Sequence, residues 1–307
     1  MINTGVQKEY VTHIRDYDYE TVCGAIGSTF PEEYEIPREN TGTLKDQGYT
    51  TACLAAVIAQ ISEAWYSKQI GEKIEMSEGF ILGAFRGELS TSSGLILTQA
   101  LKLWTTIGTL PKKYFDVLDE MPEIKKIVAK FPEFYEIASK YKLAGFVSLN
   151  YGNDEKRDLA IKSALTQYEY GLVAVSDKGF GEPHAVLLTG WNDPKGYYKF
   201  KNSYGEKYGD KGFSQITKSK IDKVYLPLFE PITLPFADVK ETDWFYNDIL
   251  KMFFAGFIKG TSETTFEPNK PLTRAEACAL FNRMSKEIDN RFDILNKVLE
   301  EKYENMH

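Results

Sequence analysis

Residues 45–55 read KDQGYTTACLA and lead into CLAAVIAQISEAWYSKQ at 53–69, a run without glycine or proline. Apolar side chains at positions 54, 57, 58, 61, 64 and 65 have the spacing of a helix buried nearly all round in its early turns. Gly48 and Thr50-Thr51 precede the run and are typical of a turn and a helix cap. The stretch predicts a buried helix that carries Cys53 in its first turn.

A cysteine in that position has a specific chemistry. The unpaired N–H groups and the dipole of a helix N-terminus favour a thiolate, which is a nucleophile once an imidazole assists it. The chain has only three histidines, and His184 stands at the start of the apolar run Ala185–Leu188. Asn202 ends the next strand-like run. Neighbouring strands can bring His184 and Asn202 together, so Cys53, His184 and Asn202 are the candidate catalytic residues.

Length and composition limit the class of protein. The 307 residues suggest two domains. The net charge of −7 and the lack of a basic cluster argue against nucleic-acid binding. No apolar stretch is long enough to span a membrane, and Met1–Val11 lacks the pattern of a secretory signal peptide. The three cysteines, at widely separated positions, argue against a disulfide framework or a zinc site.

Helical patterns precede strand patterns along the chain. Residues 1–42 are polar, with prolines that indicate an extended strap or a short pro-segment. Further helices are predicted at about 77–86, 94–107, 121–141 with a break at Pro132, and 155–168. Strands are predicted at 145–149, 172–176, 185–191 and 197–202. This order indicates an α+β fold with two lobes over 43–225, followed by a proline-marked linker near 224–235.

Three sequence blocks together resemble the papain-like cysteine peptidases. They are the Gln-Gly-x-x-x-x-Cys block ending at Cys53, the His-Ala-Val strand at His184, and the Asn-Ser-aromatic-Gly block at Asn202. Cys53 precedes His184 by 184 − 53 = 131 residues and Asn202 by 202 − 53 = 149, within the window of roughly 130–150 for that family. The resemblance covers about residues 30–220 and implies a two-lobe fold with the site between the lobes.

The resemblance also implies a role for each residue. Cys53 would be the nucleophile, His184 the general base and then acid, and Asn202 the residue that orients the imidazole. Gln47 would donate its amide N–H to the oxyanion beside the Cys53 backbone N–H. Candidate substrate-binding residues are Ser93, Gly94, Pro183 and Tyr204, the last standing where the family usually has tryptophan. We expect neither a metal nor an organic cofactor, whereas Cys23 and Cys278 are expected to be small structural residues.

Beside Cys53, this sequence departs from the family pattern at Thr50 and Leu54. Thr50 replaces a cysteine that normally forms a disulfide, which fits a reducing or disulfide-free setting. Leu54 replaces tryptophan, a change of packing more than of chemistry.

Residues 236–285 resemble one S-layer homology module. The match includes Phe-Ala-Asp-Val from 236 and Leu-Thr-Arg-Ala-Glu-Ala from 272, with Trp244 and several phenylalanines as a predicted all-α core. Thr273 and Glu276 have the spacing of a helix capping box. By resemblance the module would bind acidic cell-wall polysaccharide, with Arg274, Asp238 and Trp244 as candidate contacts. Alternatively, Arg274 pairs with Glu276 or Asp238. A terminal helix is predicted at 286–307.

The sequence therefore predicts a bacterial or phage cysteine peptidase, anchored or assembled through this module. One alternative is an endopeptidase for peptidoglycan stem peptides, and another is a papain-fold binding or scaffold protein without turnover. The expected partners are a peptide or protein substrate and cell-wall polysaccharide, with a homotrimer through the module as a further option. For the location of the protein, the module suggests the cell surface or cell wall, whereas the lack of a signal-peptide pattern argues against export by that route.

Overall fold

The computed structural model describes residues 19–85, 94–119 and 123–304. The chain divides into two compact units, one made of residues up to 66 with 74–230 and the other of 67–73 with 231–307. Within the described ranges, no helix is long and apolar enough to cross a membrane.

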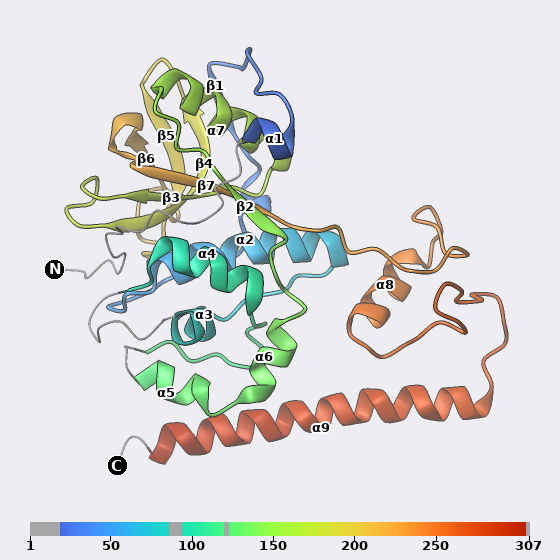
Figure 1. Cartoon of the computed structure of the whole chain (residues 1–307). Coiled ribbons are helices and arrows are strands. Elements are labelled where there is room, and N and C mark those ends of the chain that lie inside the picture. The colour runs from blue at the N-terminus through green and yellow to red at the C-terminus, as the bar shows by residue number, and fades with distance from the viewer. Residues whose placement is uncertain (1–18, 86–93, 120–122, 305–307) are drawn as a thin grey trace. The chain divides into compact units, whose positions relative to one another are not determined.

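Helix α2 (Cys53–Ile70) forms the centre of the larger unit. Every residue from Ala52 to Glu63 is at most 1% exposed, so the predicted all-round burial of the early turns is confirmed. Figure 1 shows the other helices of this lobe in the same half of the larger unit as α2. They are α3 (Glu78–Ala84), α4 (Leu97–Thr106), α5 (Glu123–Ala129) and α6 (Pro132–Ala138), with α3 next to α5. Pro132 begins α6, where its missing N–H would have no helical partner anyway.

An antiparallel sheet forms the second lobe, with α1 (Tyr19–Cys23) and α7 (Asp154–Tyr168) (Figure 1). Its main path runs β2-β7-β3-β4-β5-β6, and β1 pairs with β4 beside it. The strands are β1 (Glu33–Glu35), β2 (Gly145–Ser148), β3 (Leu172–Ser176), β4 (His184–Asn192), β5 (Tyr197–Lys201), β6 (Phe213–Thr217) and β7 (Lys223–Leu228). The α+β fold predicted from the element order is therefore confirmed.

Two segments differ from the sequence prediction. The strap of residues 1–42 contains β1, whose Glu35 pairs with Gly190 of β4, and thus belongs to the sheet from residue 33. The predicted linker near 224–235 begins instead with strand β7. Pro227 is tolerated there because β7 pairs with β3 only as far as Tyr225, beyond which no N–H is needed on that side.

The smaller unit has a compact core of its own. Phe236, Val239 and Ile249 are buried, and a ring of partly buried apolar residues packs on them. The predicted core position of Trp244 is wrong, since this side chain is 88% exposed while the adjacent Phe245 packs on the core. Helix α8 (Tyr246–Phe254) supplies Ile249.

Helix α9 (Arg274–Glu304) runs through 31 residues without a break. The predicted second helix of the module and the predicted terminal helix are therefore one element. The capping box at its start is confirmed. The backbone N–H and Oγ1 of Thr273 donate to Glu276 Oε2, and the Glu276 N–H donates to Thr273 Oγ1 at 3.2 Å.

Candidate active site

The thiol of Cys53 lies at the start of α2 and is fully buried. The backbone N–H of Ala185, next to His184 on β4, hydrogen-bonds to it, as do the N–H groups of Cys53 and Leu54. These donors favour a thiolate, but burial outweighs them and raises the pKa of the Cys53 thiol to about 12. The sequence predicted the donors at the helix start, the N–H groups of Cys53 and Leu54, but neither the donor Ala185 on β4 nor the stronger effect of burial.

His184 and Asn202 face each other across two neighbouring strands. Nε2 of His184, the first residue of β4, lies 2.7 Å from Oδ1 of Asn202, which follows β5. His184 is fully buried and Asn202 is 1% exposed. The antiparallel pairing of Leu187 with Lys201 sets this arrangement, because it carries the start of β4 to the end of β5. The structure thus brings together the two residues that the sequence put at these strand ends.

The hydrogen bonds of Asn202 define the tautomer of His184. Oδ1 also accepts the backbone N–H of Ser203 at 2.8 Å, so the oxygen rather than the amide nitrogen faces this donor. An amide oxygen can only accept, and Nε2 must therefore carry the proton. Nδ1 is then the basic nitrogen of the neutral ring.

Two aromatic rings enclose the His184 imidazole. Tyr204 stacks on it with centroids 4.8 Å apart, and Phe180 meets it edge-on, also at 4.8 Å. The Tyr204 hydroxyl lies 3.4 Å from Nδ1. Burial lowers the pKa of His184 to about 4, while the hydrogen bond with Asn202 acts in the opposite direction. A dry environment therefore holds the ring neutral in the structure.

Gln47 is connected to this group through Ser203. Its Oε1 accepts the Ser203 hydroxyl at 2.6 Å, and its Nε2 donates to the Thr50 carbonyl at 2.8 Å. One Nε2 hydrogen is thereby used, and the second is available to another acceptor. Thr50, expected to cap the helix, instead donates its hydroxyl to the Gln47 carbonyl and closes the turn before Cys53.

Ser203 was not singled out from the sequence, although it occupies the second place of the Asn-Ser-aromatic-Gly block. Its backbone carbonyl accepts the Gln47 N–H at 2.9 Å, and its hydroxyl donates to Gln47 Oε1 at 2.6 Å. The only available signal was its position beside Asn202. Ser203 therefore links the loop that carries Gln47 to the loop that carries Asn202.

Buried charges stabilise the segment that precedes Gln47. Lys45 Nζ lies 2.6 Å from Glu63 Oε1 of α2 and 3.3 Å from Glu78 Oε2 of α3. Lys201, at the end of β5, donates to both oxygens of Thr41 and to the Gly42 carbonyl, and burial lowers its pKa to about 7. These contacts hold the backbone from Thr41 to Lys45, directly before the segment that carries Gln47.

The candidate substrate-binding residues are only partly described. Ser93 lies outside the described residues, and Gly94 is buried in the loop before α4. Pro183 is half-buried in the turn that leads into His184, and Tyr204 is half-buried above the imidazole. Of these four, the structure brings Pro183 and Tyr204 next to His184.

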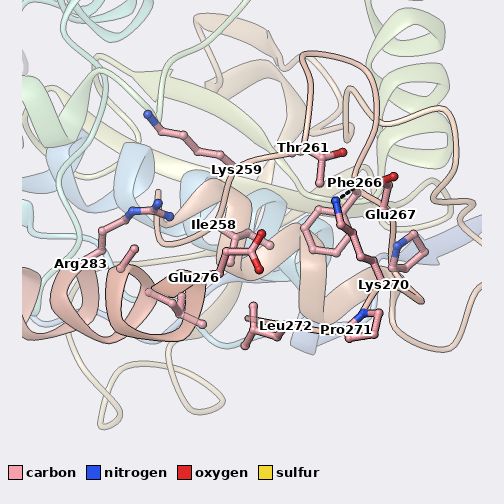
Figure 2. A pocket seen from close by; sticks show the side chains of 14 residues that line it. Ile258, Lys259, Thr261, Phe266, Glu267, Lys270, Pro271, Leu272, Glu276 and Arg283 are labelled. Atoms are coloured by element: carbon pink, nitrogen blue, oxygen red, sulfur yellow. Dashed lines mark hydrogen bonds and ion pairs between the residues drawn. The ribbon is translucent and has the colours of Figure 1, made fainter. Parts of the chain in front are cut away.

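The smaller unit holds a cavity of about 410 Å³ (Figure 2). Apolar Ile258, Phe266 and Leu272 line it together with the cations Lys259, Lys270 and Arg283. Lys270 pairs with Glu267 at 2.9 Å, and Arg283 donates to the Phe257 carbonyl at 2.6 Å. Lys259 has no ion pair among the described residues, so it is the cation available to a ligand.

The three candidate wall-binding residues lie outside that cavity. Asp238 uses its carboxylate within the module, accepting the N–H groups of Phe266 and Glu267 at 2.9 and 2.7 Å. Trp244 is 88% exposed. Arg274 is exposed at the start of α9 and forms no ion pair within the described part of the chain. The alternative pairing of Arg274 with Glu276 or Asp238 does not occur.

Comparison with known families gives two matches along the chain. The family described as papain family cysteine protease matches residues 30–226. The S-layer homology domain matches residues 235–278.

Individual relatives cover the first of these regions. The viral cathepsin of Heliothis zea nuclear polyhedrosis virus is 27% identical over 228 residues, which are 71% of this chain and 60% of that protein. The gamete and mating-type specific protein A of Dictyostelium discoideum is 33% identical over 92 residues, 25% of this chain and 20% of that protein. The chain thus spans less than two thirds of either relative.

Solved structures share the fold at low identity. Xylellain, a cysteine protease from Xylella fastidiosa, has a TM-score of 0.57 and 18% identity, covering 74% of this chain and 96% of its own. Digestive procathepsin L 3 of Tenebrio molitor has a TM-score of 0.54 and 16% identity, covering 74% and 77%. Bromelain from Ananas comosus, solved with the E64 inhibitor, has a TM-score of 0.51 and 16% identity, covering 66% and 100%.

Proposed function

Because the chain belongs to the papain family of cysteine proteases, we propose that it hydrolyses peptide bonds through an acyl-enzyme on Cys53. Cys53 is the nucleophile, His184 the general base and then acid, and Asn202 the residue that orients the imidazole. The observation that carries the proposal is the hydrogen bond from His184 Nε2 to Asn202 Oδ1, because it leaves Nδ1 as the basic nitrogen.

The reaction follows from these positions. His184 Nδ1 takes the thiol proton as Sγ of Cys53 bonds to the scissile carbonyl carbon. The second Nε2 hydrogen of Gln47 and the Cys53 N–H donate to the oxyanion. The imidazolium then protonates the leaving amine as the C–N bond breaks. A water molecule, deprotonated by Nδ1, attacks the thioester, and the acid product leaves as the thiol regains its proton.

Burial disfavours the charged form of Cys53 and of His184 when only one of the two is charged. Desolvation opposes a lone thiolate and a lone imidazolium alike, as the raised Cys53 pKa and the lowered His184 pKa show. Their mutual attraction offsets that cost only when both charges form together. Proton transfer from Cys53 to His184 is therefore coupled, and either residue alone would stay neutral.

The decisive experiment is intact-mass measurement after exposure to E64, the inhibitor present in the solved bromelain structure. We expect one adduct on the full chain, none on Cys53→Ala, and none on His184→Gln. Cys278→Ser is the matched control, since it removes an exposed thiol that belongs to the smaller unit and should keep the adduct. An adduct that survives Cys53→Ala, or its absence from the unaltered chain, would contradict the proposal.

Two alternative functions can be distinguished by testing activity on purified cell wall and on casein. Release of peptides from purified cell wall without cleavage of casein would favour an endopeptidase for peptidoglycan stem peptides. A papain-fold scaffold without turnover would cleave neither, and Cys53→Ala would leave all of its measurable functions unchanged.

We further propose that the smaller unit binds an anionic polymer, as a cell-wall polysaccharide with acidic substituents would be. Its cavity has apolar walls and Lys259, which has no ion pair among the described residues. The two carboxylates in the lining already have partners, since Glu267 pairs with Lys270 and Glu276 accepts from Thr273. Arg274 is a second contact. Its planar guanidinium is exposed at the start of α9, the helix that also contributes Ala279, Leu280 and Arg283 to the cavity lining. Co-sedimentation with purified wall should weaken in Lys259→Glu and persist in the control Lys240→Glu, whose residue lies outside the cavity lining. Equal binding by both variants would contradict this assignment.

A further inference from the structure

Helix α9 carries an exposed apolar stripe. Phe281, Ile288, Phe292 and Leu299 are 67%, 54%, 62% and 52% exposed. Their separations of 288 − 281 = 7, 292 − 288 = 4 and 299 − 292 = 7 residues place all four on one face of the helix. The stripe covers 18 residues (299 − 281), about 27 Å at 1.5 Å per residue. Large apolar side chains in such a line mark an interaction surface.

The cavity of the smaller unit lies on a different face of α9, where Ala279, Leu280 and Arg283 line it. Ile294 and Val298, further along the helix, are 1% and 6% exposed. At 3.6 residues per turn these positions lie on the side away from Phe281 and Leu299. Among the described residues, α9 therefore carries a buried apolar face in addition to the exposed stripe.

The spacing of the exposed face is that of a coiled-coil seam. Three and four residues alternate along it, through Cys278, Phe281, Ser285, Ile288, Phe292, Leu295 and Leu299. Phe281, Ile288 and Leu295 repeat at one heptad position, and Phe292 and Leu299 at the other. Such a seam is complementary to itself. We propose that a second copy of this chain docks on it, parallel and in register.

Charge favours the parallel orientation. Asp289 flanks the seam on one side, and Arg291 flanks it on the other. In a parallel two-fold pair, the side of one helix that carries Asp289 faces the side of its partner that carries Arg291. In an antiparallel pair the two Asp289 sides would face each other, and like charges so placed are destabilising.

The surface is large enough for a reversible dimer. A fully exposed aromatic side chain presents roughly 150–250 Å², so the four half-exposed residues leave on the order of 400 Å² uncovered per copy. Two copies would bury about 800 Å² from these side chains, and their neighbours add to it, against the roughly 1,200 Å² of a stable interface. A dimer that depends on protein concentration is therefore expected.

Sedimentation velocity of the full chain tests the proposal, in a Cys53→Ala background that excludes self-cleavage. We expect about 70 kDa at high concentration, twice the 35.0 kDa of the chain. Phe292→Glu should give the monomer mass, whereas Asn290→Glu, the same new charge on the opposite side of the helix, should leave the dimer intact. Far-ultraviolet circular dichroism checks that both variants keep their helix.

Cys278 tests the parallel register. A parallel pair places the two exposed Cys278 side chains opposite each other on the seam, so a short bis-maleimide should join the chains, and Cys278→Ser should abolish this. A monomer at all concentrations, a trimer near 105 kDa (three times 35.0 kDa), or a dimer that survives Phe292→Glu would overturn the proposal. A dimer in which Cys278 does not cross-link would overturn the parallel arrangement.

Discussion

The ring of Tyr204 lies on the imidazole of His184, with centroids 4.8 Å apart and an angle of 26° between the planes. This stacking covers one face of the ring whose Nε2 bonds to Asn202. A hydrogen bond shielded from water is stronger than an exposed one, because no solvent competes for its partners. Tyr204 thus helps to hold the imidazole of the proposed base in its orientation.

Removing the Tyr204 ring should therefore lower kcat more than it changes KM. We expect Tyr204→Ala to reduce kcat about 5–30-fold, equivalent to about 1–2 kcal/mol, the combined size of one ring contact and one hydrogen bond. Tyr204→Trp and Tyr204→Phe should retain most of the rate. Steady-state kinetics on one peptide substrate decides it. An unchanged kcat in Tyr204→Ala would mean that the stacking has no role in positioning.

Ser203→Ala tests the link between the two catalytic loops. The change leaves Gln47 Oε1 without the 2.6 Å hydrogen bond that now holds it. We expect kcat to fall about tenfold, less than the roughly 10²–10³-fold typical for loss of an oxyanion donor, because Gln47 remains but is less well oriented.

A double-mutant comparison separates this positioning role from general destabilisation. In a Gln47→Ala background, Ser203→Ala should have almost no further effect on kcat, since the group it positions is already gone. Thr50→Ser is a mild control that keeps the hydroxyl donation to the Gln47 carbonyl. Additive losses in the double variant would show that Ser203 acts independently of Gln47.

The free energy of unfolding should fall in acid through His184. Its pKa is lowered to about 4 in the folded chain, whereas an unfolded histidine titrates near 6.5. The unfolded chain therefore binds more protons between about pH 6.5 and 4, and stability decreases as the pH drops through that window. At about 1.4 kcal/mol per unit, the contribution of His184 is roughly 3 kcal/mol.

Urea unfolding at a series of pH values measures this contribution. Carboxylates with lowered pKa, such as Asp158, also lose stability in acid, but they are shared by the unaltered chain and His184→Gln and cancel in the difference. We expect the difference between the two forms to change by roughly 3 kcal/mol between pH 7 and pH 4. Parallel curves would show that His184 does not titrate below its ordinary range.

The sequence predicted the elements whose pattern is local. Local sequence alone predicts a helix in the apolar run after Cys53. It also predicts strands in the β-rich runs at His184 and before Asn202. It does not predict strand β1, because this strand has three residues and two of them are glutamate. It joins the sheet because Gly190 has no side chain: a Cβ there would lie 2.1 Å from the Tyr34 carbonyl oxygen.

Other differences have the same origin in tertiary contacts. Pro227 indicates a linker in the sequence. In the structure it lies in β7, and β3 pairs with β7 only as far as Tyr225, so the missing N–H of Pro227 has no consequence on that side. Trp244 and Phe245 are adjacent, so only one could face a small core, and the sequence does not say which. The Ser203–Gln47 hydrogen bond joins residues 156 positions apart, which no local pattern encodes. The candidate triad could be assembled from sequence only because three blocks occurred in order.

Gly205 gives a last test of how the loop of Gln47 is held. Gly205 has φ +74°, and its N–H donates to the Lys45 carbonyl at 3.0 Å. A Cβ at this position would lie 2.6 Å from Asp46 Oδ2. Gly205→Ala therefore combines backbone strain of about 1–2 kcal/mol with displacement of the segment that carries Gln47, and both stability and kcat should fall.

Gly196→Ala is the matched control. Gly196 also has positive φ, +67°, but a Cβ there would meet nothing within 4 Å. Its turn joins β4 to β5 at the end of these strands opposite to His184 and Asn202. It should lose stability by the strain alone, about 1–2 kcal/mol, at unchanged kcat. Thermal unfolding and kcat measured on both variants give the comparison. If Gly205→Ala lost stability yet kept its full kcat, the contact between Gly205 and Asp46 would stabilise the fold without positioning Gln47.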